Sequence, residues 1–400
     1  MESRAKSRRY LLPAVVLAVV AVLVIWMKTP PPSGILHPAD NHEAQPTPPR
    51  PGHSPAGKNE EPAGVPAPEQ SAAPDAAVAL LIRKSLENFR NNHDPEQARI
   101  HFRQLRDALR EAPEEGAAAA VADFLKTGED AATGLPFVVG PDGMMETVPT
   151  FRLALLDLLP SLDPVASLEL ARELMDRQTS PDEYALSLRN LAWNDLDGDL
   201  RDELSRRFLA LLKTPWLARP SAGFLESFDI PVEVGGSAMF DSLVSLARDA
   251  TAQSNTAASQ AAFTSLDRMI VRDRTLLTKA LSSDAAWMGF APQQRASLLS
   301  RLDITQAEQR ELFLRYLSAT SHPAGELDYF AKIFPNENFL YGHRLVTADE
   351  ATPSIAEVTQ ADARVLGELD ALAPSVSGEA LAAVDQIRAR LAKSSVRQSK

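Results

Sequence analysis

The stretch that decides the fold is residues 150–193, which read TFRLALLDLLPSLDPVASLELARELMDRQTSPDEYALSLRNLAW. It contains three helix starts, at Thr150, at Asp163-Pro164 and at Ser180-Pro181. Each offers a side-chain oxygen that can accept a hydrogen bond from the free N–H groups of a first helical turn, where proline is also tolerated. Apolar residues then recur at helical spacing. The pattern predicts three short helices, of which the first covers Phe151–Leu159 and ends at Pro160.

The same pattern continues on both sides of this stretch. Asp94-Pro95 predicts a helix with Phe102, Leu105 and Leu109 on one face. Further along, Thr305-Gln306-Ala307-Glu308 has the form of a capping box. We therefore expect an all-α domain over residues 79–400, built from short antiparallel helices.

One segment of this domain departs from helical periodicity by having a turn between apolar triplets. Phe137–Met145 reads FVVGPDGMM. A turn flanked by apolar residues predicts a small β-hairpin near 137–147. An ordered loop is the alternative.

Helix starts near 150, 163, 180 and 199 are separated by 13, 17 and 19 residues, so helix pairs recur every 30 to 36 residues. In this respect residues 80–280 resemble an α-solenoid of the HEAT or tetratricopeptide kind. The resemblance is one of architecture, and it implies an extended concave surface for binding. A compact, irregular all-α domain is the alternative.

The segment before the domain divides into a basic tail, an apolar segment and a proline-rich linker. Residues 1–9 contain Arg4, Lys6, Arg8 and Arg9, and Tyr10–Met27 follows with eighteen uncharged residues. That length spans about 27 Å as a helix, close to the hydrocarbon thickness of a bilayer. The basic residues predict a cytoplasmic N-terminus and a periplasmic or extracellular helical domain. A cleaved signal peptide is the alternative, although no cleavage site of the usual small-residue type follows.

Residues 28–78 form the linker. They contain 13 of the 30 prolines and no Phe, Tyr or Trp. Such a segment cannot bury enough apolar surface to offset the entropy of ordering it. We expect a disordered tether between the membrane and the helical domain.

Composition excludes several functions. The chain contains no cysteine, which rules out disulfides and thiolate chemistry. Residues 79–400 hold 34 Lys and Arg against 46 Asp and Glu, a net charge of −12. An acidic domain repels phosphate backbones, so nucleic acid is a poor partner. No zinc, phosphate-loop, dinucleotide or serine-hydrolase motif occurs, so we expect no cofactor, no metal and no identified catalytic residue.

The aromatic-rich, non-helical segment 334–345 is the best candidate for a recognition loop. The alternative is a loop held against the core by its own aromatic residues. Its candidate partner-binding residues are Asn336, Asn338, Tyr341, His343 and Arg344.

Three functions remain open. The favoured hypothesis is a membrane-anchored extracytoplasmic interaction or scaffold module that binds another envelope protein. The alternatives are a cell-envelope hydrolase with a carboxylate pair and a spacer without a specific ligand. Two convergent carboxyl groups with opposite pKa shifts in a deep pocket would favour the hydrolase.

Overall fold

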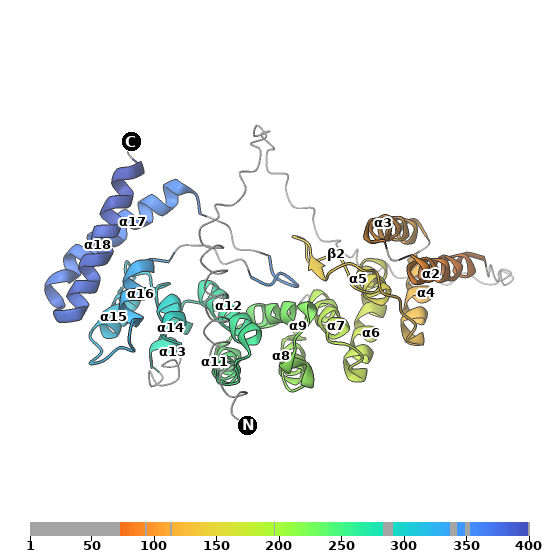
Figure 1. The fold of residues 1–400 in the computed structure, drawn as a ribbon, viewed down its shortest axis with the longest axis horizontal. Coiled ribbons are helices and arrows are strands. Elements are labelled where there is room, and N and C mark those ends of the chain that lie inside the picture. Colours follow the sequence, from red (N-terminus) through yellow and green to blue (C-terminus); the bar gives the residue numbers. More distant parts are fainter. Residues whose placement is uncertain are drawn as a thin grey trace, which may run out of the picture. The chain divides into compact units, whose positions relative to one another are not determined.

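The computed structural model describes residues 73–92, 94–112, 114–195, 197–282, 291–336, 342–348 and 353–398. These residues are mostly helical, as predicted (Figure 1). The predicted tail, the membrane anchor at Tyr10–Met27 and residues 28–72 of the predicted linker lie outside the described residues. Among the described helices, none combines the length and the hydrophobicity that a membrane crossing requires.

The first half of the described chain contains the elements α2 to α8 and a two-stranded sheet. Their bounds are α2 Ala73–Asn91, α3 Pro95–Glu111, α4 Glu114–Thr127, β1 Val138–Val139, β2 Met145–Thr147, α5 Phe151–Leu162, α6 Pro164–Arg177, α7 Pro181–Trp193 and α8 Arg201–Leu211.

The second half contains shorter helices and a final long pair. Their bounds are η2 Pro215–Ala218, α9 Ala222–Glu226, η3 Ser227–Asp229, α10 Ile230–Val234, α11 Ser237–Ala252, α12 Thr256–Arg272, α13 Leu276–Ser282, α14 Pro292–Leu299, α15 Ala307–Leu317, α16 Glu326–Ile333, α17 Ile355–Leu372, η5 Ala373–Ser375 and α18 Gly378–Gln398.

The predicted helix starts follow from side-chain caps. Asp94 accepts from the amide of Glu96, and Thr150 accepts from that of Leu153. Asp163 accepts from two amides at the start of α6. Each bond satisfies an N–H group that the helix itself leaves free. Local sequence therefore sets where α3, α5 and α6 begin.

The predicted end of α5 at Pro160 is wrong, because the helix continues to Leu162. Proline lacks the N–H that would bond to the carbonyl of Leu156 four residues earlier. In the structure the side-chain amide of Asn190, on α7, donates to that carbonyl at 3.1 Å. A neighbouring helix thus supplies the hydrogen bond that the proline cannot make.

The capping box predicted at Thr305 is also wrong. The hydroxyl of Thr305 donates to Asp303, and α15 begins at Ala307 without a side-chain cap. A nearby aspartate competes for the threonine side chain. A complete capping box instead joins Ser354 and Glu357 at the start of α17.

The small β-hairpin is confirmed. Strands β1 and β2 pair antiparallel, with Val139 opposite Met145 and Val138 opposite Thr147. An irregular register lies between Val138 and Val139. We call residues 135–147 the hairpin segment.

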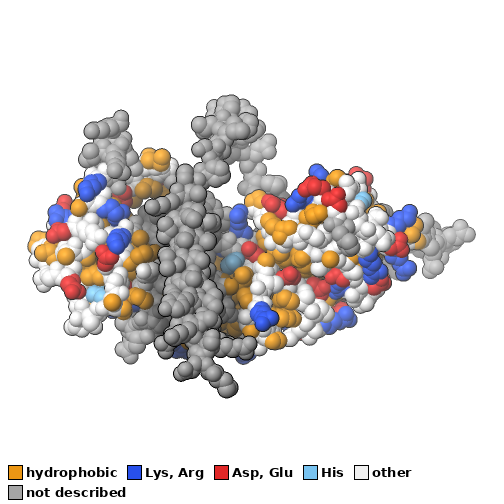
Figure 2. Space-filling model, in the orientation of Figure 1, with side chains coloured by type: hydrophobic (Ala, Val, Ile, Leu, Met, Phe, Trp, Pro, Cys, Tyr) orange, Lys and Arg blue, Asp and Glu red, His pale blue; other side chains and the backbone are white. Residues whose placement is uncertain are grey.

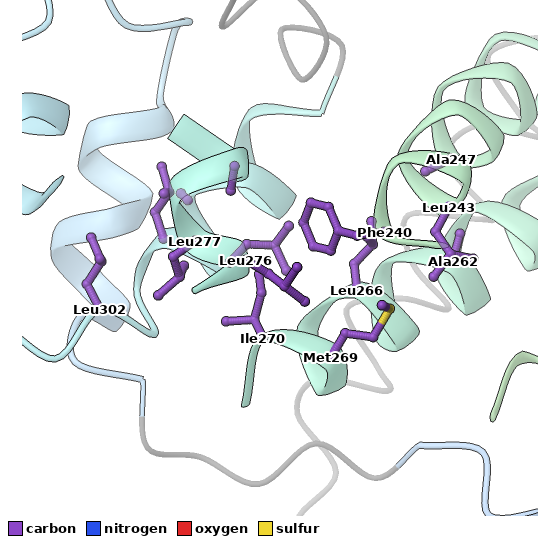
Figure 3. Close-up of a cluster of buried hydrophobic side chains, with 14 of the residues drawn as sticks. Phe240, Leu243, Ala247, Ala262, Leu266, Met269, Ile270, Leu276, Leu277 and Leu302 are labelled. Atoms are coloured by element: carbon purple, nitrogen blue, oxygen red, sulfur yellow. The ribbon is translucent and has the colours of Figure 1, made fainter. Parts of the chain in front are cut away.

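Helices that are close in sequence pack against each other through two buried clusters. The N-terminal core takes its residues from α2 to α7 and from Leu345, and the C-terminal core takes them from α6 to α18. Figure 3 shows part of the C-terminal core, where Phe240, Leu266, Ile270 and Leu277 meet between α11, α12 and α13. Acidic and basic side chains are interspersed on the face seen in Figure 2.

Candidate functional site

The predicted recognition residues are only partly described. Asn338 and Tyr341 lie outside the described residues. Asn336 is 9% exposed, and its amide N–H donates to the carbonyl of Ser300 at 2.9 Å. Its carbonyl accepts from Nη1 of Arg301 at 2.6 Å. The backbone of Asn336 is therefore tied to the end of α14.

His343 and Arg344 lie in residues 342–348, which we call the strap. The amide of Arg344 donates to Oε2 of Glu226 at 3.1 Å, and Nδ1 of His343 lies 3.5 Å from Oε1 of the same carboxylate. The carbonyl of His343 accepts from the Arg268 guanidinium. These contacts direct polar groups of the strap toward its own chain.

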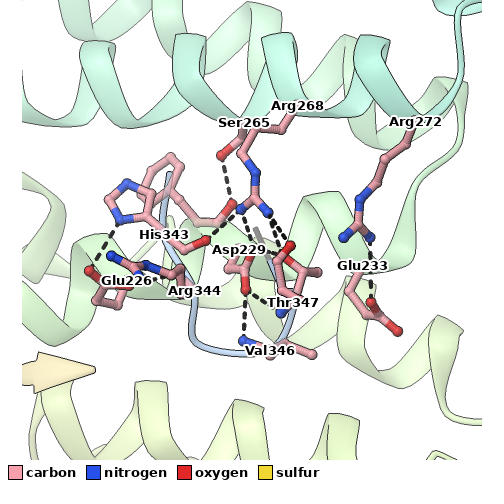
Figure 4. Close-up of polar contacts among 12 residues, drawn as sticks. Glu226, Asp229, Glu233, Ser265, Arg268, Arg272, His343, Arg344, Val346 and Thr347 are labelled. Carbon is pink, nitrogen blue, oxygen red and sulfur yellow. Dashed lines mark hydrogen bonds and ion pairs between the residues drawn. The ribbon is translucent and has the colours of Figure 1, made fainter. Parts of the chain in front are cut away.

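The strap is held by a buried ion pair between Asp229 and Arg268 (Figure 4). Oδ2 of Asp229 accepts from the amides of Val346 at 2.7 Å and Thr347 at 2.6 Å. Its Oδ1 accepts from the Thr347 hydroxyl and, at 2.7 Å, from Arg268. One carboxylate thus binds a guanidinium and two consecutive backbone amides.

The charge state of Asp229 depends on these partners. Burial raises the pKa of the Asp229 carboxyl, and the positive charge of Arg268 counters that rise. Hydrogen bonds from Thr347 and Val346 counter it further. The strap and the ion pair therefore stabilise each other.

The strap also joins the two cores. Leu345 is fully buried in the N-terminal core, and Val346 packs against both cores. In Figure 1 the strap lies beside β2 of the hairpin segment. A chain segment that follows α16 thus contacts elements that precede α6.

A second buried ion pair holds the hairpin segment. Oδ1 of Asp157 accepts from the amide of Met145 at 3.1 Å and from Nη1 of Arg189 at 2.5 Å. Arg189 also donates to the carbonyl of Gly143 at 3.0 Å. Its guanidinium lies 4.2 Å from the ring centroid of Trp193, a cation–π contact. The hairpin segment is therefore anchored to α5 and α7.

Gly143 is where the hairpin segment meets the strap, and its replacement by alanine tests that contact. A Cβ there would lie 2.9 Å from the Trp193 ring and 3.3 Å from the carbonyl oxygen of Leu345, at a φ of +79°. We expect Gly143→Ala to lower the free energy of unfolding by about 2–4 kcal/mol, combining left-handed strain with overpacking. Urea unfolding of the full-length chain measures this change.

Gly128 provides the matched control. Its φ is +78°, but a Cβ there would meet nothing within 4 Å. Gly128→Ala therefore introduces the backbone strain without the clash, and we expect it to lower the free energy of unfolding by only about 1–2 kcal/mol. Equal losses of unfolding free energy at the two glycines would show that the close approach of the strap and the hairpin segment does not add to the effect of Gly143→Ala.

Five buried ion pairs connect distant parts of the helical domain, and sequence reasoning did not identify them. Their side chains are at most 7% exposed, and each pair joins residues 31 to 39 positions apart. The available signal was a charged residue between apolar neighbours inside a helix, as in Leu266-Asp267-Arg268-Met269. The pairs are Arg152–Glu183, Arg189–Asp157, Arg268–Asp229, Arg295–Glu326 and Arg301–Asp267.

A cleft of about 660 Å³ opens between α3 and the hairpin segment. One wall is helical and carries three arginines around a phenylalanine. The other wall is the hairpin segment, which contributes apolar side chains together with Asp142 and Glu146. The lining residues include Arg99, Phe102, Arg103, Arg106, Met144 and Met145.

The arginines of the cleft differ from those of the ion-pair series. Arg99 pairs with Glu96 on the exposed surface of its own helix. Within the described part of the chain, Arg103 and Arg106 have no carboxylate partner, and Nε of Arg106 is buried without a hydrogen bond. Within the described residues, the guanidinium groups of Arg103 and Arg106 are therefore not neutralised by an ion pair, although Asp142 and Glu146 line the opposite wall of the cleft.

A second cavity of about 380 Å³ lies between the segment 317–322 and residues 375–380. His322 lines it, yet both ring nitrogens are buried and lack a hydrogen-bond partner among the described residues. Its Nδ1 lies 3.9 Å from Glu326, which pairs with Arg295. In the described chain, no group of three His, Asp or Glu residues is placed to hold a metal ion.

No protein family, curated protein or solved structure matches this chain.

Proposed function

We propose that this protein is a membrane-anchored interaction module that holds another envelope protein in the cleft between α3 and the hairpin segment. In this proposal Tyr10–Met27 is the anchor and the proline-rich segment is the tether, as the sequence predicts. The observation that carries the proposal is the cleft itself. It is open, it combines apolar and basic walls, and its volume suits a short segment of a partner rather than a single ion.

The anchoring of the cleft supports binding. Asp157 and Arg189 hold the hairpin wall through hydrogen bonds to its backbone. At Gly143 the same wall lies close to the strap. A wall fixed by buried groups loses little conformational entropy when a partner arrives. The cleft is therefore preorganised for recognition.

The scaffold that we propose is an α-solenoid-like array. Buried ion pairs connect residues 31 to 39 positions apart, close to the repeat of helix pairs expected from the sequence. In such arrays each unit contacts its neighbours, and the surface they form is extended. This arrangement suits a protein that presents a binding surface at the end of a tether.

The hydrolase alternative lacks a specific observation in its favour. Burial raises the pKa of Asp182 and of Asp229, but both carboxylates accept hydrogen bonds from their own chain. Neither residue lines either of the two cavities described above. Among the described residues, the two carboxyl groups whose pKa is raised therefore do not meet in either cavity, as the acid and base of a glycosidase would.

Affinity capture with the full-length chain tests the proposal. We expect a specific envelope protein to be recovered from solubilised membranes and to be lost with Met144→Glu, which places a charge on the apolar wall. Ile355→Glu is the matched control, since Ile355 is 74% exposed and lies outside the cleft. Recovery of no partner, or of the same partner with both variants, would contradict the proposal.

A further inference from the structure

We propose that the segment taken by the cleft is an acidic peptide, whose carboxylates pair with Arg103 and Arg106 and whose apolar side chains lie on the Met144–Met145 wall. This inference rests on the proposed function and specifies the chemistry of the partner. It is carried by the placement, charge and surroundings of these four residues.

The arginines lie on one face of α3. Arg99, Arg103 and Arg106 are four and three positions apart, which brings them to the same side of a helix. Phe102, on the same stretch, contributes apolar surface to the cleft. Arg99 already has Glu96, which leaves Arg103 and Arg106 for a ligand.

Arg103 and Arg106 make no ion pair within the described chain, whereas five buried arginines are each matched to a carboxylate. Arg106 is half-buried, and its Nε is withdrawn from water without a partner. A buried donor without a partner is destabilising, and a carboxylate ligand would supply the missing acceptor. Guanidinium groups bind carboxylates with two parallel hydrogen bonds, which adds geometric specificity.

The opposite wall explains why the ligand needs apolar side chains as well. Met145 is buried and Met144 is half-buried, and both line the cleft. Methionine is flexible and polarisable, and it adapts to varied apolar partners. A ligand that carried carboxylates alone would leave this wall uncovered.

Two carboxylates in the same cleft distinguish a peptide from a nucleic acid. Asp142 and Glu146 line the hairpin wall and would repel a continuous row of phosphates. A peptide backbone instead offers N–H donors between its carboxylates.

Fluorescence anisotropy with the full-length protein tests this inference. The probe is a labelled short peptide of alternating glutamate and leucine. Comparison probes replace glutamate by lysine, replace leucine by glycine, or use single-stranded oligothymidine. We expect the glutamate–leucine probe to bind most tightly and to weaken as salt is raised. Tighter binding of the lysine probe, the glycine probe or the oligonucleotide would overturn the inference.

The variants assign the interaction to the two arginines. We expect Arg103→Gln and Arg106→Gln each to weaken binding about tenfold, the effect of losing one charge-assisted hydrogen bond. Arg103 is exposed, so its replacement leaves the fold intact. Arg110→Gln is the matched control, since Arg110 lies on the exposed surface of α3 outside the cleft lining.

Equal binding by all three variants would overturn the inference without touching the proposed function. In that case affinity capture would still recover a partner with Arg103→Gln and Arg106→Gln and would lose it with Met144→Glu. If capture recovered no partner at all, the proposed function itself would fail. The two failures are therefore distinguishable.

Discussion

Replacing Arg268 by methionine is expected to lower the free energy of unfolding by about 3–5 kcal/mol, the usual cost of removing one partner of a buried ion pair. Asp229 would stay fully buried without its counter-charge. The strap would also lose the guanidinium contacts to the carbonyl of His343 and the hydroxyl of Thr347. Urea unfolding of the full-length chain at neutral pH measures the change.

Arg388→Met provides the control for this change. Arg388 pairs with Asp370 at 2.5 Å, but both side chains are exposed. Exposed ion pairs contribute little to stability because water and salt screen them. We therefore expect Arg388→Met to change the free energy of unfolding only slightly. A loss as large as that of Arg268→Met would show that burial of the ion pair does not determine its contribution to stability.

The effect of Arg268→Met should also depend on pH. Without Arg268, the largest influence that opposes burial is lost, and the pKa of Asp229 rises further above its unfolded value of about 4. A carboxyl with a raised folded pKa contributes stability below its unfolded pKa and loses that stability as pH rises through its folded pKa. The deficit of the variant should therefore widen as pH rises from the folded pKa of Asp229 in the wild type toward its higher folded pKa in the variant, whereas a constant deficit would contradict this account.

Helix starts were predictable because their causes are local. Asp94, Thr150 and Asp163 each cap a helix within three residues of their own position. The hairpin segment was predictable for the same reason, since its turn and its apolar flanks are adjacent in sequence. What the sequence shows directly is therefore the position of short elements.

Features that depend on distant residues were not predictable. The helix α5 passes through Pro160 because Asn190, on another helix, occupies the free carbonyl of Leu156. The predicted box at Thr305 fails for a local reason instead, because Asp303, two residues earlier, accepts a hydrogen bond from its hydroxyl. Only the fold shows that Asn190 lies near the carbonyl of Leu156, whereas the competition at Thr305 lies within the local sequence.

The candidate recognition loop illustrates the same limit. Its polar, aromatic and non-helical character suggested exposure to a partner. In the described part of this segment, the amide of Arg344 instead donates to Glu226, which is 118 positions away. The sequence did not single out the cleft arginines Arg103 and Arg106. Their significance depends on the hairpin wall opposite them, which periodicity does not place.

The pair Asp157–Arg189 allows stability and binding to be separated. Asp157→Leu alone would leave Arg189 fully buried without a counter-charge, and we expect a loss of about 3–5 kcal/mol in the free energy of unfolding. The double variant Asp157→Leu/Arg189→Met replaces both charges with apolar groups. Such replacements of a whole pair are often neutral or stabilising, so we expect most of the loss to be recovered.

Recovered stability should not restore the cleft. The double variant still lacks the bonds that Asp157 and Arg189 make to the backbone of Met145 and Gly143. We therefore expect faster hydrogen exchange at the Met145 amide and weaker binding of the glutamate–leucine probe, although the unfolding free energy is near that of the wild type.

Asp267→Leu/Arg301→Met is the matched control. It replaces another buried pair, whose hydrogen bonds to other described residues do not reach the hairpin segment. It should leave both the Met145 exchange rate and the probe affinity unchanged. If both double variants bind the probe equally well, the hairpin wall does not need its buried anchor. If both lose binding, the effect is one of general stability, and the role assigned to Asp157 and Arg189 in shaping the cleft is wrong.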